Sequence, residues 1–180
     1  MSRLKVKYQK EIVPALQRAL NTKNRLAIPR LEKVTINVGI GKSLKDPKIG
    51  EAVSSTLERI AGQHPVATKA KQSISNFKVR QGQIVGCVVT LRGERMYDFV
   101  DKLISITLPR VRDFRGIDPK MVDGQGNLNI GFREHMAFPE IHADEVEKIH
   151  GLQVTITTKT KSREAGLELF RLLGVPFRQQ

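Results

Sequence analysis

Lysine and arginine side chains dominate the chemistry that this sequence offers between Glu58 and Glu94. No acidic residue lies between these two positions, whereas six basic residues do: Arg59, Lys69, Lys71, Lys78, Arg80 and Arg92. A basic surface on an ordinary protein is usually interspersed with acidic groups that weaken its field. An acid-free run of this length therefore favours contact with phosphate groups over a merely solvated surface.

An acidic membrane surface is the alternative partner for such a run. A helix that lies on a membrane carries basic residues on one face and bulky apolar groups on the other. The segment VATKAKQSISNFKVRQGQ (66–83) instead contains Ser, Asn, Gly and Gln in numbers that are typical of a loop. The pattern therefore predicts a basic loop and disfavours a membrane-surface helix.

The whole chain shares this basic character, but unevenly. Its 180 residues carry 31 Lys and Arg against 18 Asp and Glu, which gives a formal net charge of +13. Residues 1–120 hold all of the excess, because residues 121–180 carry 7 basic and 8 acidic groups. A balance of this kind indicates a polyanionic partner, and nucleic acid fits it best.

The composition also limits the class of protein. Apolar residues make up 39% of the chain, which is enough for a packed core. Cys87 is the single cysteine, so no internal disulfide can form, and its apolar context predicts a buried structural thiol. The N-terminal sequence has no apolar signal segment, and no apolar run is long enough to span a bilayer. We therefore expect a cytoplasmic protein that does not associate with membranes.

Enzymatic motifs are weak in this chain. The run VGIGKS (38–43) resembles the end of a phosphate-binding loop, but the first glycine of that motif falls on Ile36. A dinucleotide fingerprint fails because Leu44 occupies its third glycine position. The three candidate metal ligands, His142, Glu145 and His150, lack any established ligand spacing. We expect no catalytic residue, no cofactor and no metal site.

Hydrophobic periodicity predicts the elements that must position the basic and polar side chains. Strands are expected at residues 34–38, 64–68, 84–92, 127–133 and 152–158. Helices are expected at residues 4–20, 47–61, 94–108 and 163–173, with Asp46 and Ser162 as caps and Gly62 and Gly174 as ends. Pro14 should kink or restart the first helix, and Pro109 should stop the third. Residues 110–126 are expected to form a long loop.

These elements predict one α+β domain over residues 1–180. Its mostly antiparallel sheet of about five strands would carry helices on one face. The other face would be open and polar, and four residues are expected there: Thr35, Asn37, Thr90 and Arg92. Such a face is a natural surface for a nucleic acid.

Several long runs resemble the bacterial large-subunit ribosomal proteins of the L-five family, which bind 5S ribosomal RNA. They are PRLEKVTINVGIGKS (29–43), TKAKQSISNFKVRQGQIVGCVVTLRGERMYDFVDKLI (68–104), LPRVRDFRGI (108–117), DGQGNLNIGFRE (123–134) and FPEI (138–141). The resemblance extends in order from about residue 3 to Phe177. It implies a structural, non-catalytic constituent of the large subunit, with an open concave sheet face that helps to hold 5S rRNA in the central protuberance.

The resemblance implies an rRNA-binding surface built from short polar and basic side chains. Three positions match the polar residues of that surface: Asn37, Gln63 and Thr90. Three basic residues are the expected phosphate partners: Arg30, Lys33 and Arg92. Polar side chains of this kind can bond ribose hydroxyls, while the cations release counterions from the RNA.

Two further surfaces follow from the same resemblance. The loop 73–82 would contact P-site tRNA through Ser75, Asn76, Phe77, Lys78 and Arg80. The segment 109–117 would meet a small-subunit head protein in an intersubunit bridge through Arg110, Arg112, Asp113 and Arg115. Two alternatives stay open, because Phe77 can anchor the loop in the core and Arg112 can pair locally with Asp113.

The remaining expectations concern partners and departures from the family pattern. The resemblance implies 23S rRNA and a neighbouring 5S-binding ribosomal protein as further partners, with this chain a monomer within the ribosome. Four residues differ from the usual pattern: Gln125, Leu128, His135 and Lys159. A free-standing enzyme or regulator that binds nucleic acid, and a membrane-surface protein, remain the rival classes.

Overall fold

The computed structural model describes residues 2–22, 24–41, 47–141, 149–160 and 162–178. The chain divides into two compact units. Unit 1 comprises Met1–Val34, Leu91–Ile130 and Val154–Gln180, and unit 2 comprises Thr35–Thr90 and Gly131–Gln153. Because strands pass from one unit to the other along the chain, this division does not test the prediction of a single domain.

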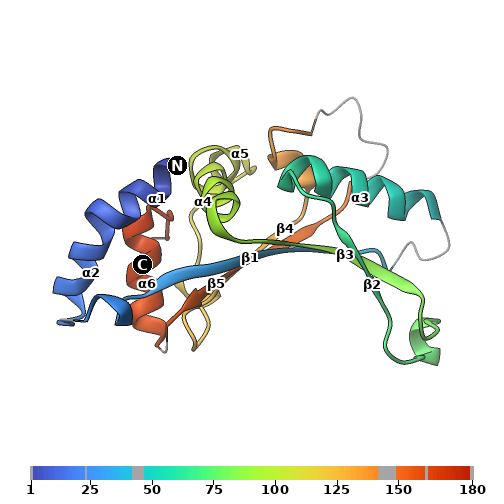
Figure 1. Ribbon diagram of the computed structural model, residues 1–180. Helices are drawn as coiled ribbons and strands as arrows, with labels where there is room; N and C mark the ends of the chain where they lie inside the picture. Colours follow the sequence, from blue (N-terminus) through green and yellow to red (C-terminus); the bar gives the residue numbers. More distant parts are fainter. Residues whose placement is uncertain (1, 23, 42–46, 142–148, 161, 179–180) are drawn as a thin grey trace. The chain divides into compact units, whose positions relative to one another are not determined.

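A five-stranded sheet organises the chain (Figure 1), with strand order β2-β3-β1-β5-β4. The strands are β1 (Arg30–Gly39), β2 (Val66–Lys69), β3 (Ile84–Leu91), β4 (Leu128–Phe132) and β5 (Leu152–Lys159). The sheet is open and antiparallel, and Val66 of β2 lies opposite Val88 of β3. The predicted α+β class is therefore confirmed.

Alternating burial explains why these segments form strands. In β3, Val89 and Leu91 are buried while Thr90 between them is exposed, and Asn37 on β1 is likewise exposed between two buried residues. A strand whose side chains alternate in this way buries one face and leaves the other to water. Cys87 lies on β3 and is buried, which raises the pKa of its thiol and confirms the predicted structural role.

The second and last long helices begin and end as the sequence predicts. Helix α3 (Pro47–Ala61) ends at Gly62, whose φ is +63°. Helix α6 (Arg163–Leu173) begins at Ser162, whose hydroxyl accepts a hydrogen bond from the Ala165 amide at 3.3 Å, and it ends at Gly174. The predicted cap Asp46 lies outside the described residues. Figure 1 shows α3 lying across one face of the strands of unit 2.

Pro14 acts as the sequence predicts, whereas Pro109 differs slightly from its prediction. The first helical run consists of α1 (Arg3–Lys7), the π-helix η1 (Tyr8–Ile12) and α2 (Val13–Ala19), so Pro14 restarts an α-helix. The third consists of α4 (Gly93–Lys102), the π-helix η5 (Leu103–Thr107) and α5 (Leu108–Arg110). This run ends at Arg110, so Pro109 is its penultimate residue and not, as predicted, the first residue beyond it. A wide π turn before each proline accommodates its ring and its missing N–H, and the proline then sits in a first helical turn.

Two other segments also differ from the prediction. Strand β3 ends at Leu91, so Arg92 lies beyond the sheet, where it precedes α4. Residues 110–126 are not one open loop, because they contain the 3-10 helix η6 (Pro119–Met121). Ile117, in the same segment, also forms a parallel bridge with Phe177.

No helix among the described residues is long and apolar enough to cross a bilayer.

Polar contacts and rings hold the helices of unit 1 to one another. The Arg3 guanidinium donates to the Asp101 carboxylate of α4 at 2.8 and 3.1 Å. The Tyr8 hydroxyl donates to the Pro29 carbonyl at 2.9 Å, and its ring lies 6.1 Å from the Tyr97 ring. Burial, aided by Tyr97, raises the pKa of Tyr8 to about 12, so this hydroxyl remains a donor at neutral pH.

A stacked histidine pair lies in unit 2, where the 3-10 helix η7 (His135–Ala137) follows β4. The rings of His135 and His150 stack with centroids 4.0 Å apart and planes 9° apart. Burial, together with the neighbouring His135, lowers the pKa of His150 to about 4. The His150 ring is therefore neutral at pH 7, which permits the close stacking.

Gly126 is the tightest point of the turn between Asp123 and Asn127 in unit 1. The Asp123 carboxylate accepts hydrogen bonds from the Gln125 and Asn127 amides at 2.9 and 2.8 Å. Gly126 has a φ of +79°, and a Cβ placed there would meet the Ser162 carbonyl at 2.9 Å. Glycine is required here both by the backbone conformation and by the close approach of α6.

We expect Gly126→Ala to lower the free energy of unfolding by about 2–4 kcal/mol, because it combines a strained φ with a clash against backbone. Urea denaturation measures this loss. Gly124→Ala is the matched control in the same turn, since a Cβ at Gly124 meets no heavy atom within 4 Å. Equal unfolding midpoints for the two variants would contradict the prediction.

Candidate nucleic-acid interface

The three polar residues predicted to bind rRNA all belong to unit 2. Asn37 on β1 and Thr90 on β3 are exposed, because their neighbours along each strand point into the core. Gln63 lies between α3 and β2, and its side-chain amide donates to the Thr90 carbonyl at 3.2 Å. The structure therefore brings Gln63 and Thr90 together and leaves the Thr90 hydroxyl on the exposed side.

Uncharged hydrogen-bonding groups continue along the strand segments of unit 2. Thr35 on β1 is half-buried, and Gln153 on β5 is exposed. Hydroxyl and amide groups on a sheet can bond ribose hydroxyls, phosphate oxygens and base edges without a charge of their own. These strand positions are suited to recognising the shape of an RNA, whereas the electrostatic attraction must come from other residues.

The three predicted phosphate partners belong to unit 1. Arg30 is exposed at the start of β1, Lys33 is half-buried on the same strand, and Arg92 is exposed before α4. None of them forms an ion pair among the residues that the structure describes. The structure thus divides the six predicted rRNA-binding residues between the two units, and the three cations are available to an anionic ligand.

The loop between β2 and β3 is closed by backbone hydrogen bonds at its base. The Ala70 amide donates to the Gln83 carbonyl at 2.8 Å, and the Gly82 amide donates to the Ala70 carbonyl at 2.9 Å. Further out, Ile74 and Val79 form an antiparallel bridge around the 3-10 helix η4 (Ser75–Phe77). Figure 1 shows this green segment extending beyond the ends of β2 and β3. The predicted basic loop is therefore a projection of unit 2 that is closed by hydrogen bonds at its base.

All five residues predicted to contact tRNA are exposed at this projection: Ser75, Asn76, Phe77, Lys78 and Arg80. The Phe77 side chain is 73% exposed, so the alternative in which it anchors the loop in the core is wrong. Lys78 and Arg80 form no ion pair in the described part of the chain. A bare aromatic ring beside unpaired cations offers one stacking surface and two phosphate contacts.

The segment predicted to form the intersubunit bridge exposes all four of its charged residues: Arg110, Arg112, Asp113 and Arg115. Its far end is fixed, because the Ile117 amide donates to the Pro176 carbonyl at 2.8 Å. The Arg178 amide donates to the Ile117 carbonyl at 2.9 Å. The alternative of a local pair between Arg112 and Asp113 is wrong, since no such ion pair occurs in the described ranges.

Sequence reasoning missed one exposed basic turn in unit 1. The 3-10 helix η2 (Arg25–Ala27) presents Leu26 with 88% of its side chain exposed. The sequence does contain a signal for this turn, because no acidic residue lies between Glu11 and Glu32.

Within the described residues, no three His, Cys, Asp or Glu side chains gather as a metal site. The metal-ligand candidates His142 and Glu145 lie outside the described residues.

Known protein families match this chain over nearly its whole length. Residues 24–80 match the model of the family described as Ribosomal protein L5, and residues 84–177 match the model that describes the C-terminus of the same ribosomal family. The Large ribosomal subunit protein uL5 of Symbiobacterium thermophilum is 52% identical over 180 residues, which cover all of both chains. That of Halothermothrix orenii is 51% identical over 179 residues, 99% of this chain and 100% of that one.

These matches confirm the resemblance seen in the sequence and decide between the rival classes. Members of this family are structural, non-enzymatic components of ribosomes, so the alternative of a free-standing enzyme is excluded. RNA binding and a role in translation follow from membership, and they agree with the unpaired cations of both units. The chain belongs to the ribosomal protein L5 family and is a structural component of the large ribosomal subunit.

Proposed function

We propose that this protein binds 5S rRNA and helps to attach it to the large subunit in the central protuberance. The observation that carries the proposal is the polar strand surface of unit 2, where Asn37 and Thr90 are exposed between buried apolar neighbours. Gln63 extends that surface, because its side chain is tied to the Thr90 carbonyl at 3.2 Å. We assign these three side chains to ribose and phosphate contacts that recognise the shape of the RNA.

Arg30, Lys33 and Arg92 of unit 1 supply the electrostatic part of the same binding. Each is a cation without an ion-pair partner within the described residues. A free cation that meets a phosphate releases a counterion from the RNA, so it contributes affinity that decreases as salt increases. A cation already paired with a carboxylate would contribute much less.

Lys33→Gln and Arg92→Gln should each weaken 5S rRNA binding and reduce the slope of log affinity against log salt by about one, because each removes one phosphate contact. Filter binding across a salt series measures both quantities. Lys10→Gln is the control, since Lys10 is an exposed cation of η1 outside the proposed surface. Wild-type slopes for both test variants would refute the phosphate assignment.

We further propose that the projection of unit 2 contacts P-site tRNA. Phe77 offers an exposed ring, and Lys78 and Arg80 lie on the same hydrogen-bonded loop. Stacking on an aromatic ring and contact with the phosphate backbone are both insensitive to base sequence. The loop can therefore contact successive tRNAs of different sequence.

The double variant Lys78→Ala with Arg80→Ala should leave 5S rRNA affinity intact and increase the dissociation of P-site tRNA from assembled ribosomes, because it removes two cations from the loop alone. Toeprinting and filter binding measure these two effects. Gln81→Ala, an exposed uncharged change in the same loop, is the matched control. Equal losses of tRNA and 5S rRNA binding would place the loop in the 5S surface instead.

We also propose that Arg110, Arg112, Asp113 and Arg115 contact a small-subunit head protein in an intersubunit bridge. All four are exposed on a segment that is fixed at Ile117. Charged groups on a surface of this kind favour a polar contact that forms and breaks as the subunits join and separate.

The 23S rRNA and a neighbouring 5S-binding protein complete the proposed partners, with one copy of the chain in each cytoplasmic ribosome.

The charge-reversing variant Arg112→Glu with Arg115→Glu should weaken the joining of purified subunits roughly three- to tenfold, since it reverses two contacts of the bridge. Light scattering at limiting magnesium measures the equilibrium. Lys7→Glu, an exposed change on α1, is the control. Undiminished joining with the double variant would disprove the contact.

A further inference from the structure

The turn at residues 24–27 of unit 1, here called the Asn24 turn, is held by hydrogen bonds within the turn and by the buried residues that follow it. The Asn24 side-chain oxygen accepts from the Leu26 amide at 2.9 Å, and its carbonyl accepts from the Ala27 amide at 3.1 Å. The next residues, Ile28 and Pro29, are buried, and the Pro29 carbonyl accepts from the Tyr8 hydroxyl. The turn is therefore a fixed feature of the surface.

Leu26 is the most exposed large apolar side chain in the described part of the chain, at 88%. Scattered exposed leucines are common on protein surfaces and indicate nothing by themselves. This one differs because a capped turn presents it, so the backbone loses little conformational freedom when a partner covers the side chain. An apolar side chain on such a turn is suited to packing against a flat apolar surface.

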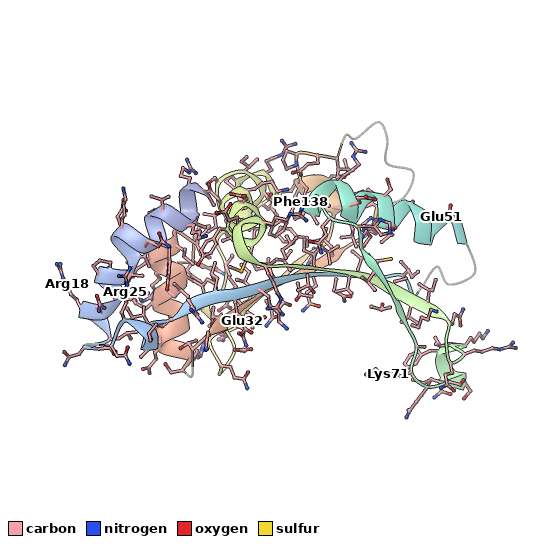
Figure 2. The ribbon with its side chains drawn as sticks, viewed as in Figure 1. Arg18, Arg25, Glu32, Glu51, Lys71 and Phe138 are labelled. Carbon is pink, nitrogen blue, oxygen red and sulfur yellow. The ribbon has the colours of Figure 1, made fainter. Side chains whose placement is uncertain are left out.

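The charges around the Asn24 turn are all of one sign. Residues 12–31 contain no acidic residue and four basic ones: Arg18, Lys23, Arg25 and Arg30. Arg18, Arg25 and Arg30 are exposed, and they form no ion pair in the ranges that the structure describes. Figure 2 shows Arg18 on the outer side of α2, together with Arg25 of the turn.

Arg25 and Arg30 lie close to the base of the turn. Both cations act against the burial that raises the pKa of Tyr8, whose hydroxyl is bonded to Pro29. Glu32, the nearest acidic residue along the chain, lies two residues beyond Arg30 on β1 and makes no ion pair with it. Two unpaired guanidinium groups thus flank the base of a turn with a leucine at its tip.

We propose that the Asn24 turn extends the rRNA contact of Arg30, in that Leu26 packs against an unpaired nucleotide and Arg25 and Arg30 bind the adjacent phosphates. Apolar side chains are used in this way against exposed base and sugar surfaces, with arginines on the flanking backbone. A protein partner fits less well, because protein interfaces usually pair charges of both signs around their apolar centre. This inference rests on the proposed function, since it takes rRNA as the partner.

The test uses the full-length protein with 5S rRNA and with 23S rRNA, each titrated separately across a salt series. Leu26→Ser should weaken the binding of at least one of these RNAs about fivefold at every salt concentration, with the salt slope unchanged, because an apolar contact releases no counterions. Arg25→Gln should lower the slope for the same RNA by about one. Leu26→Met should retain wild-type affinity.

Ile106→Ser is the matched control, because Ile106 is an apolar residue of unit 1 that is 45% exposed outside the turn. Wild-type affinity of Leu26→Ser for both RNAs overturns the inference, as does equal weakening by the Ser and Met variants. Thr90→Val reports separately on the proposed 5S surface. If Thr90→Val weakens binding and Leu26→Ser does not, the inference about the Asn24 turn is overturned and the proposed 5S surface is kept. If Leu26→Ser weakens 23S rRNA binding, the inference is supported even when Thr90→Val has no effect.

Discussion

The one-sided burial of β1 and β3 constrains what these strands can present to a ligand. Successive side chains of a strand point to opposite faces, so the buried Ile36, Val38 and Val89 require that Asn37 and Thr90 face outward. A slip of one residue would exchange the two sets and expose the apolar core. The polar surface of unit 2 is therefore formed by the same packing that stabilises the strands.

Glycine at position 86 illustrates how closely the strands of unit 2 approach each other. A Cβ at Gly86 would lie 2.6 Å from the Val38 carbonyl and 3.0 Å from the Thr68 hydroxyl. Any side chain there would separate β3 from its neighbours or displace the Val38 carbonyl. The Gln63 side chain contacts the same strand further along, where its amide donates to the Thr90 carbonyl.

Several of the exposed cations for which a partner is proposed lie outside the strands, in turns and loops. Lys78 and Arg80 lie on a hydrogen-bonded loop, Arg25 on a capped turn, and Arg112 before a segment anchored by backbone bonds. Unpaired cations at such positions repel one another and gain from a polyanion that neutralises them. These cations, together with Arg30 and Lys33 of β1, supply electrostatic attraction, whereas the uncharged strand positions of unit 2 are suited to shape recognition.

Local sequence determined the strands, their buried faces, the caps at Ser162 and Gly174, and the basic character, because each depends on neighbouring residues alone. The tertiary structure alone decided the exposure of Phe77 and Leu26, since the burial of a loop side chain depends on what distant segments pack around it. It also decided that the helix ends at Arg110 and includes Pro109, which follows a π turn. The family resemblance predicted which residues bind RNA, whereas the geometry showed that the cations among them form no ion pair within the described residues.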